Sequence, residues 1–108
     1  MNLEHFKLDN MIGGWFIGNF EPTLFKTEDF EVGVKQYKQG DTEEVHYHKI
    51  ATEFTLVLNG SVEMSGQQYH HGDIIKAKPG VATNFIAITD VTTVVVKVPG
   101  ATNDKYLK

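Results

Sequence analysis

Between Phe30 and Val98 the chain is a succession of short strand-like stretches, each ended by a turn signal. The turn signals are pairs of residues such as Gly40-Asp41, Asn59-Gly60 and Pro79-Gly80, which favour reversals of the backbone. The interior of the chain shows no stretch with the spacing of an amphipathic helix. Many short strands with regularly spaced turns are typical of a sandwich or barrel of antiparallel strands. We therefore predict an all-β fold, most economically a single jelly-roll barrel.

Two local patterns give more detail. In the stretch 30–37 alternate residues separate into two faces, either of which could point inward. In Leu58-Asn59-Gly60-Ser61-Val62 the Asn-Gly pair suits a type I′ turn, so we predict a hairpin in which residues 62–64 pair back onto the preceding strand. The polar tail after Pro99-Gly100 is expected to form a short helix or a cap.

The length of the chain fits one domain. With 108 residues it can bury one modest core. We predict a single domain over residues 1–108, with an N-terminal arm and strands in 1–29, the barrel core in 30–98 and a C-terminal tail in 99–108.

Charge and composition exclude several partners. The formal net charge is -4 and no Lys/Arg cluster is present, which argues against nucleic acid or an anionic membrane as a partner. Cysteine is absent, so disulfides and thiolate metal sites are excluded. The apolar run Met11 to Ile17 is too short to span a membrane and lacks the basic flank of a signal peptide. We expect a cytoplasmic protein.

The stretch 40–60 holds the residues most suggestive of a metal site. His46 and His48 are one residue apart, so on an extended strand both would project from the same face, with Tyr47 on the other. Two neighbouring imidazoles do not suit a hydrophobic core, whereas they are common ligands in metal sites. Glu53, after a short bend, could supply an anionic third ligand.

These residues resemble the first motif of the cupin superfamily. That motif has a glycine, five residues, His-x-His, three or four residues, a glutamate, six residues and a second glycine. All of its fixed positions are present, as Gly40, His46, His48, Glu53 and Gly60. The resemblance implies a double-stranded β-helix that binds a divalent metal through two histidines, a glutamate and a third histidine. It gives His46, His48 and Glu53 as the metal ligands.

The second cupin motif is matched only in part. Gly72 and Gly80 agree with it, but Lys78 stands at its proline position, Thr83 at its histidine position and Ala87 at its asparagine position. The third histidine ligand is therefore missing. Two histidines and a carboxylate can still hold Fe, Mn, Ni, Co or Zn. The alternative is a relic site, in which the three side chains bond to one another or to a ligand.

The resemblance implies binding of a small polar metabolite such as a sugar. One hypothesis is an enzyme, a dioxygenase or an isomerase or epimerase; the other is a binding module without catalysis. We predict substrate contacts from Thr83, Asn84, Phe85 and Gln36. By contrast, solvation in a polar turn explains the acidic pair Glu43-Glu44.

Cupins commonly form homodimers by sheet packing, so a homodimer is expected here. Apolar residues predicted to be exposed, namely Ile86, Ile88 and the strand from Val94 to Val98, would form its interface.

Overall fold

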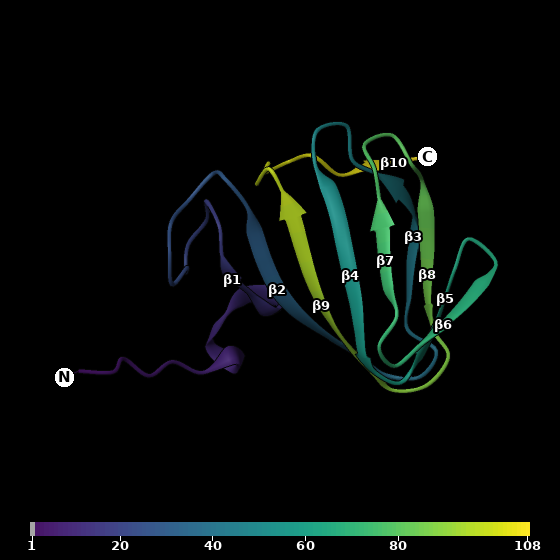
Figure 1. The fold of residues 1–108 in the computed structure, drawn as a ribbon, viewed down its shortest axis with the longest axis horizontal. Helices are drawn as coiled ribbons and strands as arrows, with labels where there is room; N and C mark the ends of the chain where they lie inside the picture. Colours follow the sequence, from purple (N-terminus) through teal and green to yellow (C-terminus); the bar gives the residue numbers. More distant parts are fainter. Residues whose placement is uncertain (1) are drawn as a thin grey trace.

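The computed structural model of the chain describes residues 2–108, and its strands form two five-stranded antiparallel sheets (Figure 1). The strands are β1 Trp15–Ile17, β2 Glu31–Tyr37, β3 Thr42–Tyr47, β4 Thr52–Asn59, β5 Ser61–Met64, β6 Gln67–His70, β7 Ile74–Ala77, β8 Thr83–Ala87, β9 Val91–Val98 and β10 Tyr106–Leu107. One sheet has the order β1-β2-β9-β4-β7 and the other β10-β3-β8-β5-β6. The predicted all-β jelly-roll fold is confirmed.

Strand β9 lies at the centre of the first sheet, because it pairs with β2 on one side and β4 on the other. Its many β-branched residues suit this position. Alternate residues Val91, Thr93 and Val95 are buried. The expectation of an exposed apolar surface along 94–98 is therefore wrong at Val95, which is 7% exposed, whereas Val98 is 45% exposed.

The space between the sheets is apolar at one end and polar at the other. The register of β2 on β9 shows this, because Tyr37 lies opposite Val91 at one end and Glu31 opposite Lys97 at the other. The apolar end is filled by a cluster of buried side chains from β4, β5, β8 and β9, namely Val57, Val62, Met64, Phe85, Ala87 and Val91, with Tyr37, Tyr69 and Ile75 packed against it. The polar end is left with a cavity.

The hairpin predicted at Asn59-Gly60 is wrong. Strand β4 pairs with β7 and β9, while β5 pairs with β6 and β8 in the other sheet. The turn therefore carries the chain from one sheet to the other. Gly60 is needed there because its φ is +84° and an added Cβ would collide with the backbone of Asp90.

The two ends of the chain differ. The N-terminal segment runs away from the barrel as an extended arm (Figure 1). It is followed by two short 3₁₀ turns, Leu8–Asn10 and Ile12–Gly14, before β1. The C-terminal tail forms strand β10, which pairs with β3, so the expected short helix is wrong. Within residues 2–108 no helix is long and apolar enough to cross a membrane.

Candidate functional site

His46 and His48 lie at the end of β3 and just beyond it, and both are buried at 8% and 7% exposure. Their rings meet edge to face, with centroids 5.6 Å apart and an interplanar angle of 88°. Tyr47 between them stacks on Tyr106 of β10, with centroids 5.5 Å apart. The alternation of an extended chain thus brings both imidazoles to the inner side of β3.

Glu53 reaches the two histidines from β4. Its carboxylate Oε2 lies 3.8 Å from Nε2 of His48. All three side chains line one cavity of about 140 Å³ between the sheets. The structure therefore brings together the three residues that the first motif predicts as metal ligands.

Burial sets the charge state of this group. Desolvation, together with the smaller effects of Lys97 and His46, lowers the pKa of His48 to about 4. Desolvation raises the pKa of Glu53, against the opposing effect of Lys97. Above its pKa His48 is a neutral imidazole, which is the form that binds a metal.

The hydrogen bonds of the histidines are those of potential ligands. Nδ1 of His46 lies 2.9 Å from the backbone oxygen of Glu44. A carbonyl only accepts, so Nδ1 carries the proton and Nε2 of the neutral ring keeps a free lone pair, as in many metal-binding histidines. Nε2 of His48 is buried and has no hydrogen-bond partner among the described residues.

The donor atoms of the histidines and Glu53 nevertheless lie farther apart than in a formed metal site. Within residues 2–108, no three or more His, Cys, Asp or Glu side chains lie in an arrangement that could hold a metal ion. Bonds of about 2.1 Å at a tetrahedral angle place two donor atoms about 3.4 Å apart. The 3.8 Å between His48 and Glu53 is close to that value. The donor atoms are thus of the kind that binds a divalent ion, and small side-chain movements would have to bring them within bonding distance of it.

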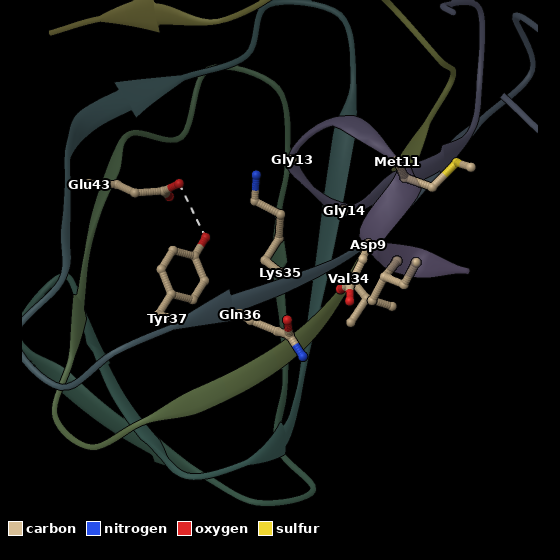
Figure 2. A pocket seen from close by; sticks show the side chains of 10 residues that line it. Asp9, Met11, Gly13, Gly14, Val34, Lys35, Gln36, Tyr37 and Glu43 are labelled. Atoms are coloured by element: carbon tan, nitrogen blue, oxygen red, sulfur yellow. Dashed lines mark hydrogen bonds between the residues drawn. The ribbon is translucent and has the colours of Figure 1, made fainter. Parts of the chain in front are cut away.

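The four residues predicted to contact substrate occupy different places. Thr83 and Asn84 line a narrow space beside His46 and Glu53, together with Phe85. Phe85 is buried and its ring lies against Tyr37, with centroids 4.4 Å apart. Gln36 is exposed and lines the neighbouring outer cavity of about 370 Å³, not the cavity that holds the histidines (Figure 2).

Thr83 and Asn84 are held by a neighbouring turn. The Thr83 hydroxyl donates to the backbone oxygen of Asn84 at 2.9 Å and accepts from the hydroxyl of Ser65 at 2.9 Å. The side-chain oxygen of Asn84 accepts from the Ser65 amide at 2.8 Å. Thr83, at the position of the missing histidine, therefore already has both a donor and an acceptor partner.

The cavity also contains residues that the sequence did not single out as ligands. Glu43 is half-buried and accepts a hydrogen bond from the Tyr37 hydroxyl at 3.2 Å (Figure 2). The expectation that solvation in a turn explains Glu43 is thus wrong, because Glu43 belongs to β3. Burial, and then Glu43, raise the pKa of Tyr37, so this phenol stays protonated. Lys35, Lys97 and Trp15 line the same cavity.

Asp104 fixes the loop that joins His48 to Glu53. Its carboxylate accepts hydrogen bonds at 2.9–3.2 Å from the backbone amides of Lys49, Ile50 and Ala51. Burial disfavours its charge, but these three amides together outweigh that effect and lower its pKa. No sequence pattern marks this residue, since it is a lone aspartate in a polar tail.

No protein-family model matches the chain, and no curated protein does. Solved structures do. An uncharacterised conserved protein with a double-stranded β-helix domain from Klebsiella pneumoniae has a TM-score of 0.73 at 21% identity, covering 99% of this chain and 98% of its own. KdgF from Halomonas has a TM-score of 0.65 at 20% identity, covering 71% and 74%. Oxalate decarboxylase from Bacillus subtilis, a protein with Mn(II) centres, has a TM-score of 0.63 at 19% identity. The match covers 75% of this chain but only 24% of the decarboxylase. The chain therefore has the double-stranded β-helix fold of the cupins.

Proposed function

We propose that this chain is a metal-binding cupin that holds a small polar metabolite in the cavity between its sheets. The observation that carries the proposal is Nε2 of His48, which is buried without a hydrogen-bond partner in the described chain and faces Glu53 at 3.8 Å. A buried nitrogen without a partner is costly. A metal ion held between the two side chains would remove that cost.

His46, His48 and Glu53 would hold the ion, which Fe, Mn, Ni, Co or Zn would each suit. A divalent ion bound there would polarise a substrate oxygen as a Lewis acid or, as Fe(II), activate O₂. The Mn(II) centres of the similar oxalate decarboxylase support a metal in this fold. The hydrogen bond from Nδ1 of His46 to the Glu44 carbonyl supports the ligand role, because it fixes the ring and leaves Nε2 free.

Tyr37 and Glu43 are placed to support chemistry on a bound metabolite. The protonated Tyr37 hydroxyl holds the Glu43 carboxylate at the junction of the inner cavity and an outer one of about 370 Å³ (Figure 2). Glu43 is therefore positioned to take up a substrate proton and return it, as an isomerase requires.

A second candidate is a binding protein without catalysis. Thr83 favours it, because the residue at the third histidine position has its hydroxyl bonded to Ser65 and to the backbone of Asn84. Oxygen uptake and proton-exchange NMR with candidate sugars and sugar acids separate the two. Turnover by wild type that is lost in Glu43→Gln supports the enzyme, and binding without turnover supports the binding protein.

Metal uptake tests the proposal directly. We expect chelator-treated protein to take up one equivalent of Mn²⁺, Co²⁺ or Zn²⁺ in a calorimetric titration checked by elemental analysis. The double variant His46→Ala, His48→Ala should lose this uptake while keeping its β-sheet circular dichroism. The control His71→Ala removes an exposed histidine outside the cavity and should bind as wild type. Wild type that takes up none of these ions or Fe²⁺ or Ni²⁺, or a double variant that still binds one equivalent, would refute the assigned site.

A further inference from the structure

Two lysines from adjacent strands enter the cavity beside the candidate metal ligands. Lys35 comes from β2 and Lys97 from β9. Both ammonium groups lie near the indole of Trp15, at 5.5 Å and 4.9 Å from its ring centroid. Gly33 makes room for that ring, since an added Cβ would lie 2.7 Å from a Trp15 carbon. Trp15 is thus a platform shared by two cations.

The two ammonium groups have few partners of their own. Among the described residues neither makes a hydrogen bond, and the single ion pair is the 3.9 Å approach of Lys97 to Glu31. An ammonium has three donors to satisfy. The Lys97 side chain is only 15% exposed, so water replaces these bonds incompletely. Figure 2 shows the Lys35 amine standing free between the Tyr37–Glu43 pair and Gly13.

Lysines outnumber carboxylates in the lining of the cavity. Lys35, Lys97 and Lys105 line it with two glutamates, Glu43 and Glu53, while a third glutamate, Glu31, pairs with Lys97 from outside it. The charges cancel when all three carboxylates are ionised, and a divalent metal at the histidines would leave an excess of two. An anion between lysines that share one cavity would be bound with favourable Coulomb energy.

We propose that Lys35 and Lys97, on the Trp15 platform, form a subsite for the carboxylate or phosphate group of a small anionic ligand. The subsite deepens the proposed function by giving the class of its metabolite, and it depends on that function only for the choice of cavity. The inner cavity of about 140 Å³ is below the ~300–1,000 Å³ of pockets for drug-sized ligands, so it would hold only the acidic end of a larger ligand, whose remainder would lie in the outer cavity that Lys35 also lines. The ligand is therefore an organic acid or a phosphorylated metabolite.

Trp15 is the sole tryptophan, so its fluorescence reports directly on this subsite. The probes are malonate, inorganic phosphate and malonamide, which has the shape of malonate without its charge, each titrated at constant ionic strength. We expect a saturable change in emission with malonate, phosphate or both, and none with malonamide. Whichever anion binds tells whether the group recognised is a carboxylate or a phosphate.

Lysine variants tie the signal to the subsite. Lys35→Met and Lys97→Met, with Lys35→Gln and Lys97→Gln as second choices if folding suffers, should each weaken anion binding about tenfold or more. The control is Lys76→Met, whose ammonium lies 5.8 Å from the Phe54 ring outside the cavity, and it should bind as wild type. The subsite is disproved if no anion saturates the signal, if malonamide acts like malonate, or if the cavity lysine variants bind as tightly as wild type.

The two proposals fail independently. Titrations of chelator-treated protein and of His46→Ala, His48→Ala should still show saturable anion binding. Anion binding without metal uptake supports the subsite and refutes the metal site. Metal uptake without anion binding supports the metal site and refutes the subsite.

Discussion

Asp104→Ala is expected to destabilise the barrel by about 3 kcal/mol, through the loop between His48 and Glu53. The buried amide of Ala51, a residue 1% exposed, would lose its acceptor, which costs about 1–3 kcal/mol. The amides of Lys49 and Ile50 belong to exposed residues, so water recovers part of their bonds and each loss costs about 0.5–1 kcal/mol. Urea unfolding measures the sum, and thermal unfolding should show a midpoint lower by about 10–20 °C.

The matched control is Asp41→Ala, which removes one acceptor from the exposed backbone amide of Lys38 and should cost less than about 1 kcal/mol. Asp104→Asn keeps an acceptor oxygen and should fall between wild type and Asp104→Ala. The loop positions His48, so Asp104→Ala should also weaken metal binding, and Asp41→Ala should not. If Asp104→Ala were no less stable than Asp41→Ala, the carboxylate would not be holding the loop.

Two further predictions follow from the cavity. In metal-free protein the pKa of His48 falls from 6.5 unfolded to about 4 folded, so the unfolded state binds more protons between these values and stability rises with pH from 4 to 6.5. Comparison with His48→Gln by urea unfolding should show this contribution, about 3 kcal/mol at 1.36 kcal/mol per pKa unit, and an equal pH slope in both proteins would contradict it. Gly33→Ala places a methyl group against the Trp15 ring, so the tryptophan emission should shift and anion binding should weaken; unchanged emission would show that the ring does not rest on Gly33.

The fold was predictable because its signals are local. Turn residues divide the chain into short strands, and the first cupin motif lies within the single stretch 40–60. Local signals were not sufficient at Asn59-Gly60. There the sequence predicted a turn correctly, but it did not predict which strands would pair on either side of it. A turn signal describes a few backbone angles, whereas pairing partners depend on how both sheets close.

The sequence placed candidate site residues on β3, β4 and β8, but it did not mark the other residues of the cavity. Lys97, Lys35 and Trp15 meet through the pairings of β1 with β2 and β2 with β9, which join segments distant in the sequence. Asp104 acts on a loop more than fifty residues before it. None of these four residues belongs to a motif that marks it as functional, so only the three-dimensional structure brings them together.

The central place of β9 has a consequence for folding. Strands β2 and β4 both need β9 as a partner, yet β9 is nearly the last strand of the barrel to be synthesised. Contacts between such distant segments cost loop-closure entropy before they give any stability, so folding is expected on the slow, millisecond-to-second scale of all-β domains. A nascent chain therefore exposes the inner edges of β2 and β4 until β9 emerges. Because β9 also carries Lys97, the cavity would acquire this charge only when the first sheet is complete.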